Sequence, residues 1–234
     1  MELYVFQKGF NYSQDGPGNR LVYHLSGCSL RCPWCSNPEG KAAGSGQVYT
    51  VEEMVAEAVS ARPMFFGGGG VTLTGGEVTE QFSSVEALLS ALKAQDIHTC
   101  IETNGTHPCL PELAALVDHL IMDIKHPNDA NHRAVIGCGN QTILANLDAL
   151  SARQLAVRIP LIGGFNEDAA DAFAQLLRGR DITVEVLRYH EYGKDKYKAL
   201  GLPYPMTENA YISDEVYRNF TQTLTDAGIR VVRT

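Results

Sequence analysis

Short apolar segments typical of buried β-strands alternate with segments typical of α-helices along most of the chain, and this alternation constrains the fold most strongly. The strand segments cover residues 4–10, 21–25, 71–74, 97–102, 120–124, 156–161, 182–187 and 229–232, and 4–10 is expected at the edge of a sheet. The helical segments cover residues 50–62, 84–94, 111–117, 142–152, 169–177 and 214–227. Thr50 and Glu53 have the spacing of a capping box at the start of the first helix.

Strands that alternate with helices favour a parallel sheet whose strands are joined by crossover helices. About six such units fit in this chain, whereas a complete barrel of eight units usually needs about 250 residues. We therefore predict an α/β fold, a partial, open (β/α)6 barrel of the TIM type, in one domain over residues 1–234.

The composition excludes several classes of protein. Hydrophobic residues make up 44% and charged residues 20% of the 234 residues, which is typical of a globular protein and not of a disordered chain or a coiled-coil rod. The net charge of −8, without a long basic run, argues against a nucleic-acid partner. The sequence has no apolar stretch of about 18 residues and no apolar core of a signal peptide near its start. We expect a cytoplasmic monomer that does not bind membranes.

Unusual residues follow the predicted strands at their carboxyl ends, where ligand sites of parallel α/β folds collect. Three cysteines follow 21–25, and a glycine-rich segment with Glu77 follows 71–74. Residues 102–105, 123–125 and His190 follow the later strands, and Arg158 lies within one. These residues are therefore expected to share one rim of the sheet.

Cys28, Cys32 and Cys35 have C-x3-C-x2-C spacing, which can bring three thiolates to one inorganic centre. A closed zinc site needs a fourth ligand, and there is no Cys or His between Cys35 and His98. Three thiolates suit an iron–sulfur cubane with one iron open to an outside ligand. Zinc with His24 as fourth ligand, and three free cysteines without a ligand, are the alternatives. Cys100, Cys109 and Cys138 fit no ligand set.

The cysteine loop, with Trp34 before its last cysteine, resembles that of the radical S-adenosylmethionine (SAM) superfamily. Within that superfamily, successive segments resemble the signatures of glycyl-radical enzyme activating enzymes, without the cysteine-rich ferredoxin-like insert of many relatives. These segments are 15–20, 34–39, 69–77, 123–125, 158–162 and 189–197. Ser36 follows the third cysteine where one branch of that family has His, so the identity of the target stays open.

The resemblance implies a 4Fe–4S cluster on Cys28, Cys32 and Cys35, with SAM bound to the open iron. An electron from flavodoxin or ferredoxin would cleave SAM, and the resulting 5′-deoxyadenosyl radical would take a hydrogen atom from a glycine of a partner glycyl-radical enzyme. The alternative functions are a radical SAM enzyme that acts on a small molecule or peptide, and a non-catalytic iron–sulfur or zinc protein.

The resemblance also implies the SAM-binding residues. Gly75 and Gly76 would let the backbone approach the methionine part of SAM, and Glu77 would pair with its ammonium group. Lys125, also expected to take part in catalysis, would offer a cation to the carboxylate or the ribose. The full predicted set is Trp34, Ser36, Gly75, Gly76, Glu77, Asp123, Ile124, Lys125, Arg158 and His190. A turn for the glycine pair, and core packing for Trp34 and His190, are the structural alternatives.

The resemblance also implies a monovalent-cation site beside SAM, which would use the carboxylates of Glu102 and Asp123 and the carbonyls of Thr103 and Ile121. Residues 15–20 are a candidate contact for the target's glycine loop. A basic run, Lys194, Lys196 and Lys198, is either a dock for an acidic partner or a solvated face.

Overall fold

The computed structural model describes residues 1–150 and 155–232, which form two compact units. The first unit comprises Met1–Ser29 and Glu39–Ile121, and the second comprises Leu30–Pro38 and the chain from Met122 onward. The chain therefore enters the second unit at the cysteine loop, returns to the first at Glu39 and leaves it again at Met122.

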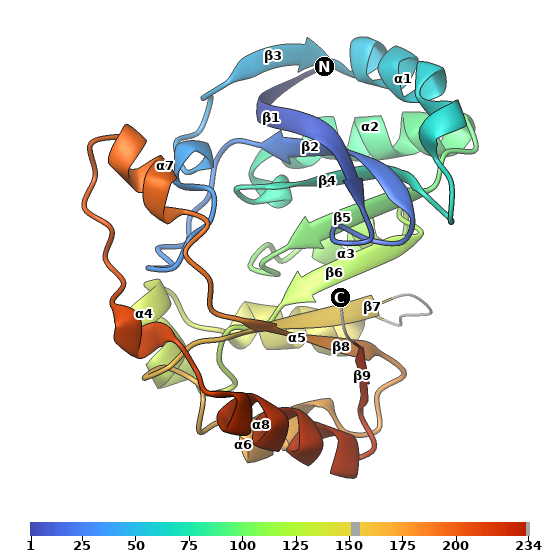
Figure 1. Cartoon of the computed structure of the whole chain (residues 1–234). Helices are drawn as coiled ribbons and strands as arrows, with labels where there is room; N and C mark the ends of the chain where they lie inside the picture. Colours follow the sequence, from blue (N-terminus) through green and yellow to red (C-terminus); the bar gives the residue numbers. More distant parts are fainter. Residues whose placement is uncertain (151–154, 233–234) are drawn as a thin grey trace. The chain divides into compact units, whose positions relative to one another are not determined.

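The first unit is built on five strands in the order β3-β1-β2-β4-β5 (Figure 1). They are β1 (Glu2–Tyr12), β2 (Asn19–Leu25), β3 (Gln47–Thr50), β4 (Gly70–Gly75) and β5 (Thr99–Thr103). β1 pairs antiparallel with both β2 and β3, whereas β2, β4 and β5 are parallel. The short strand β3 pairs with β1 only at Glu2–Val5. Among the strands that the structure describes, residues 6–10 therefore lie at the edge of the sheet as expected, and residues 4 and 5 do not.

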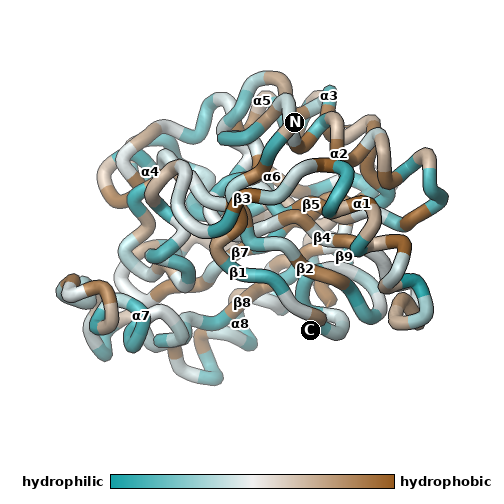
Figure 2. Tube along the Cα trace, turned by 90° about the horizontal axis from the view of Figure 1, so that it is seen from above, coloured by the Kyte–Doolittle hydropathy of each residue, from teal (hydrophilic) through white to brown (hydrophobic). Residues whose placement is uncertain are grey.

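The helices of the first unit are α1 (Val51–Ser60), α2 (Phe82–Ala94) and α3 (Leu110–Ala114). The capping box at the start of α1 is confirmed: the Glu53 N–H donates to Thr50 Oγ1 (3.1 Å), and the Thr50 N–H donates to the Glu53 carboxylate (2.8 Å). α1 and α2 lie side by side (Figure 1). Both helices bury an apolar stripe, and β2, β4 and β5 carry apolar residues that are drawn brown in Figure 2.

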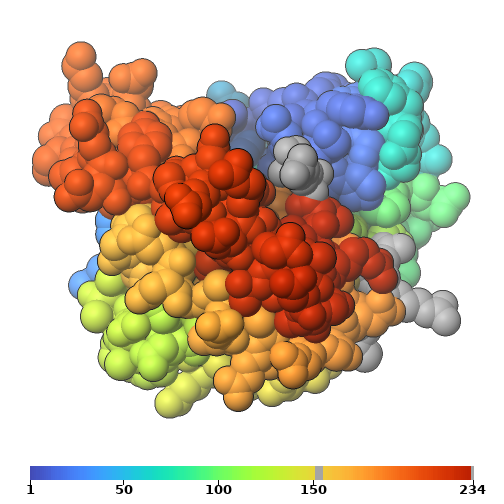
Figure 3. Space-filling model, turned by 60° about the horizontal axis from the view of Figure 1, so that its bottom comes forward, coloured from blue at the N-terminus to red at the C-terminus, as the bar shows by residue number. Residues whose placement is uncertain are grey.

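β6 (His119–Asp123) carries the chain from the first unit into the second. The second unit contains the parallel strands β7 (Leu155–Leu161), β8 (Thr183–Arg188) and β9 (Arg230–Val232), in that order. Its helices are α4 (Asp129–Ile136), α5 (Gln141–Ala149), α6 (Ala170–Leu177), α7 (Lys194–Ala199) and α8 (Asp214–Asp226). α8, drawn red in Figure 3, packs beside α6 at the surface, and Phe173 contacts Phe220 with ring centroids 5.8 Å apart.

Among the β-strands and α-helices of the described residues, the sequence pattern missed β3, α4 and α7. β3 has no buried residue, and α7 buries only Tyr197, so neither segment shows an apolar period. α4 is held mainly by its caps: the Asn128 side chain accepts from the Asn131 N–H (3.0 Å), and Gly137 ends the helix with φ +95°. The helix expected at 142–152 is α5, and its last two expected residues, 151 and 152, lie outside the described residues.

No helix within the described ranges is long and apolar enough to cross a membrane; the longest, α2 and α8, have 13 residues each.

Candidate functional site

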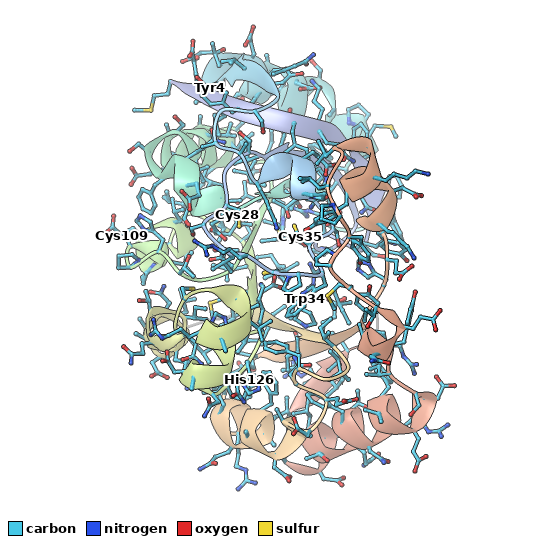
Figure 4. All side chains as sticks on the ribbon, turned by 90° about the vertical axis from the view of Figure 1, so that its left-hand side faces the viewer. Tyr4, Cys28, Trp34, Cys35, Cys109 and His126 are labelled. Atoms are coloured by element: carbon cyan, nitrogen blue, oxygen red, sulfur yellow. The ribbon has the colours of Figure 1, made fainter. Side chains whose placement is uncertain are left out.

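The cysteine loop begins two residues after Ser26, which follows the last residue of β2. Cys28 belongs to the first unit, and Cys32 and Cys35 belong to the second (Cys28 and Cys35 are labelled in Figure 4). All three cysteines are half-buried, and none of them forms a disulfide with another described residue. The Cys35 N–H donates to the Cys32 carbonyl (3.3 Å), which makes a tight turn around Trp34. Within neither unit do three His, Cys, Asp or Glu side chains of the described residues gather into a metal-binding group.

The Glu77 carboxylate is a buried hub of the first unit, with 1% of the residue's surface exposed. Its Oε1 accepts from the Thr79 N–H (3.0 Å), the Thr79 hydroxyl (2.7 Å) and the Thr103 hydroxyl (2.7 Å), and its Oε2 accepts from the Asn104 N–H (2.7 Å). Burial raises the pKa of Glu77, and the four donors oppose that rise. Glu77 thus joins the loop after β4 to the loop after β5.

The two glycines before Glu77 are required by the packing of the backbone itself. Gly75 has φ +114°, a conformation that favours glycine. A Cβ atom at Gly76 would lie 2.2 Å from the Gly27 carbonyl oxygen and 2.8 Å from that of Gly40. Gly76 therefore lets the loop after β4 lie directly against the segment that precedes Cys28.

Asp123 and Lys125 lie at the end of β6 in the second unit. The Lys125 Nζ donates to Asp123 Oδ2 (2.8 Å), which compensates an ammonium group whose residue is only 6% exposed. The buried Asn166 side chain donates to the Lys125 carbonyl (2.9 Å), and the Ile124 N–H donates to the Arg158 carbonyl (2.9 Å). These bonds fix the backbone from which Lys125 projects.

Arg158, on β7, has a partner within the protein. Its Nε donates to Glu185 Oε2 (2.6 Å) on the neighbouring strand β8, where the two residues are in register. Both side chains are mostly buried, with 12% and 7% exposed. Glu185 thus gives the buried guanidinium a carboxylate partner within the protein, and a contact of Arg158 with SAM stays a prediction.

Trp34 and His190 belong to aromatic clusters of the second unit. Trp34 packs on Phe165 with ring centroids 5.0 Å apart, and His126 contacts Phe165 with ring centroids 5.1 Å apart (Trp34 and His126 are labelled in Figure 4). His190 stacks on Tyr192 (4.0 Å), and its Nδ1 accepts from the Tyr192 N–H (3.4 Å). Burial lowers the pKa of His190, which favours the uncharged ring. Because Nδ1 accepts the hydrogen bond, the proton of the uncharged ring lies on Nε2.

The segment after the cysteine loop is held against the turn before α7. A Cβ atom at Gly193 would lie 2.3 Å from the Cys35 carbonyl oxygen and 3.2 Å from Ser36 Cα. Lys196 Nζ donates to Asn37 Oδ1 (3.0 Å). Part of the basic run is therefore engaged within the protein, and Lys194 pairs with Glu191 in the same way (2.7 Å).

Residues 15–20 lie at the opposite end of β2 from Cys28. Arg20 is fully buried, and its guanidinium donates to the Thr72 hydroxyl (2.6 Å), the Pro17 carbonyl (2.9 Å) and the Val71 carbonyl (2.7 Å). Through these bonds, Arg20 holds the loop before β2 against β4. They give residues 15–20 a structural role, and their contact with a target glycine loop stays a prediction.

The residues of the predicted cation site are divided between the units, with Glu102, Thr103 and Ile121 in the first and Asp123 in the second. Glu102 Oε2 accepts from the Thr74 hydroxyl (2.8 Å), and Asp123 accepts from Lys125. The site stays a prediction.

Sequence reasoning placed Asn104 on the rim but gave it no function, and it did not identify Glu185 or Asn166. Asn104 Nδ2 lies 3.9 Å from the Cys28 Sγ. The signal for these three residues is their pairing across strands and loops, which a single sequence does not show.

A model of the radical SAM superfamily matches residues 22–177. The chain is 34% identical to pyruvate formate-lyase 1-activating enzyme of Escherichia coli K12 over 82% of each chain. It is 36% identical to pyruvate formate-lyase-activating enzyme of Staphylococcus epidermidis over 86% of each chain.

Solved structures agree with these relatives. A domain of pyruvate formate-lyase-activating enzyme from Bacteroides vulgatus is 27% identical, with a TM-score of 0.57 over 71% of this chain and 99% of that chain. A radical SAM methyltransferase from Sphaerobacter thermophilus, 20% identical, shares the fold with a TM-score of 0.65 over 100% of this chain and 76% of that chain. The predicted fold class, α/β with an unclosed parallel sheet, is confirmed.

Proposed function

The chain belongs to the radical SAM superfamily, and we propose that it is an activating enzyme that installs a glycyl radical in a partner glycyl-radical enzyme. The observation that carries this proposal is the identity of 34–36% to pyruvate formate-lyase-activating enzymes over most of the chain. Pyruvate formate-lyase is the first candidate partner, since the relatives are named for it. Other glycyl-radical enzymes are tested beside it because of Ser36.

The cysteine loop suits a 4Fe–4S cluster. Three half-buried cysteines lie on one short loop, and no further cysteine follows before Cys100, which is buried. Three thiolates leave one iron for an outside ligand, here SAM. When bound, the cluster supplies the electron that cleaves SAM, and the 5′-deoxyadenosyl radical so formed takes a hydrogen atom from the partner's glycine.

Gly75, Gly76 and Glu77 would hold the methionine part of SAM. Gly75 and Gly76 fix the loop against the segment before Cys28, and a carboxylate oxygen can accept two hydrogen bonds. Glu77 Oε2, which accepts from the Asn104 N–H, has the chemistry to take an ammonium N–H as well.

Lys125 and His190 would hold the rest of SAM. Lys125, fixed by Asp123 and Asn166, offers positive charge to a carboxylate, and neutral His190 offers an Nε2–H to the nucleoside. Trp34, Ser36, Ile124 and Arg158 complete the proposed site, with Glu102 and Asp123 beside it as ligands of a monovalent cation.

The wider assignments are part of the same proposal. Residues 1–234 act as one catalytic domain, in a cytoplasmic monomer reduced by flavodoxin or ferredoxin. The partner is a protein and not a nucleic acid or a membrane.

The test is anaerobic incubation of the reconstituted protein with SAM, reduced flavodoxin and each candidate partner. Electron paramagnetic resonance should show a glycyl doublet in the true partner, and a Gly→Ala change at the target glycine should abolish it. Absence of the doublet with every candidate, together with SAM-dependent conversion of a small molecule or free peptide, would overturn the proposal.

A further inference from the structure

The side-chain amide of Asn104 is fixed with its N–H groups toward the Cys28 sulfur. Asn104 follows β5 and is only 6% exposed. Its Oδ1 accepts from the Thr106 N–H (3.0 Å) and from the Thr106 hydroxyl (2.6 Å). Because the atom that accepts two hydrogen bonds must be the carbonyl oxygen, the other branch is the NH2 group. That group lies 3.9 Å from the Cys28 Sγ, at the long end of N–H···S contacts.

The backbone that carries this amide is also held. The Asn104 N–H donates to Glu77 Oε2 (2.7 Å), and the Thr103 hydroxyl donates to Glu77 Oε1 (2.7 Å). The Gly105 N–H in turn donates to the Thr103 hydroxyl (3.1 Å). Movement of this backbone would break bonds within a buried loop, and rotation of the amide away from Cys28 would break its two bonds with Thr106.

We propose that Asn104 is a positioning residue of the cluster, whose amide N–H donates to the Cys28 sulfur and raises the reduction potential. This inference rests on the proposed function, which makes Cys28 a cluster ligand. Hydrogen bonds to cysteine sulfurs are one of the factors that set the potential of iron–sulfur clusters. Reduction adds one electron and makes the sulfurs more negative, so an N–H donor stabilises the reduced cluster more than the oxidised one.

A purely structural role would be to close the turn between Asn104 and Thr106. Two substitutions separate the roles, because Asn104→Asp and Asn104→Ser both keep an oxygen that can accept from the Thr106 N–H. Both remove the amide N–H from the sulfur. The serine variant adds no charge, so it distinguishes a lost hydrogen bond from a new negative charge.

Thr106→Val is the matched control. It removes the hydroxyl that donates to Asn104 Oδ1 but leaves the Thr106 N–H and the Asn104 amide in place. It therefore perturbs the same turn without removing the donor to Cys28.

The measurement is a redox titration of the reconstituted proteins without SAM or partner, followed by the electron paramagnetic resonance signal of the reduced cluster, with iron analysis and circular dichroism of each protein. We expect the equilibrium constant for reduction to fall about tenfold in Asn104→Ser, which is about 59 mV for one electron. In Asn104→Asp this equilibrium constant should fall by at least as much, and in Thr106→Val it should stay within about twofold of the wild-type value.

An unchanged midpoint in Asn104→Ser with a complete cluster overturns the proposal, and so does an equal shift in Thr106→Val. If Asn104→Ser does not fold, an unchanged midpoint in Asn104→Asp has the same meaning. Because no partner enzyme is present, failure of the glycyl-radical assay leaves this result intact. Failure of the wild-type protein to bind iron would overturn both proposals and would be seen in the iron analysis.

Discussion

Replacement of Glu77 by alanine should destabilise the first unit before any cofactor is bound. The substitution leaves two buried backbone N–H groups, those of Thr79 and Asn104, without their acceptor. The hydroxyls of Thr79 and Thr103 lose the same acceptor but can rotate toward other oxygens. The main cost therefore comes from the two backbone groups.

Each buried donor left unsatisfied costs about 1–3 kcal/mol, so two of them cost about 2–6 kcal/mol. Burial raises the pKa of Glu77, so removal of its charge recovers part of the desolvation free energy and favours the lower half of that range. Even about 2–4 kcal/mol is a large share of the 5–15 kcal/mol by which a typical domain is stable. Glu77→Gln keeps one acceptor oxygen and should lose about half as much.

Urea unfolding of the cluster-free protein, followed by circular dichroism, measures this loss as a lower midpoint. Glu80→Ala is the control, because Glu80 is exposed in the same 3-10 helix (Val78–Gln81) and should change the free energy of unfolding by less than about 0.5 kcal/mol. If the free energy of unfolding of Glu77→Ala lies within about 0.5 kcal/mol of the wild-type value, the stabilising role assigned to this carboxylate is refuted.

Two further predictions concern the cysteine loop and His98. The reconstituted wild-type protein should hold about four irons per chain, as one cubane requires. Substitution of Cys28, Cys32 or Cys35 by alanine should prevent formation of a complete cluster, whereas Cys109→Ala should not. A full iron count in Cys32→Ala would contradict the assignment of the cluster ligands. Burial lowers the pKa of His98, and the neighbouring Arg20 lowers it further. The unfolded chain therefore takes up this proton first as pH falls below about 6.5, and stability is lost. Urea midpoints between pH 7.5 and 5.5 should fall by a smaller amount in His98→Asn, and an identical pH dependence in both proteins would count against this reasoning.

Local sequence signals predicted the elements that depend on local physics. The first helix begins where Thr50 and Glu53 form their capping box, and α8 begins where Ser213 accepts from the Val216 N–H. Buried strands such as β2 can be predicted because their central residues, here 21–25, are mostly apolar. β3 could not be found in this way, because it forms only where β1 offers an unpaired edge.

In the candidate site, too, the features set by local sequence could be predicted and those set by tertiary packing could not. The rim residues follow their strands in the sequence, so their positions could be expected without a structure. The hydrogen-bond partners of these residues could not be predicted from the sequence. Arg158 pairs with Glu185 because of the register between β7 and β8, and the Asn104 N–H donates to Glu77, which lies 27 residues earlier in the sequence. The long-range hydrogen bonds that give these side chains an orientation are set by tertiary packing.

The residues that contact the cysteine loop are synthesised long after the loop itself. The Arg31 N–H donates to the Ile136 carbonyl (3.0 Å), Trp34 packs on Phe165, and the Cys35 carbonyl lies against Gly193. At the usual rate of about 5–20 residues per second, Gly193 leaves the ribosome's active centre about 8–30 s after Cys35. For that time the nascent chain carries Cys32 and Cys35 without the backbone contacts that later shape their loop. We therefore expect cluster insertion to follow translation, and we expect newly made chains to be the form most sensitive to oxygen and to adventitious metals.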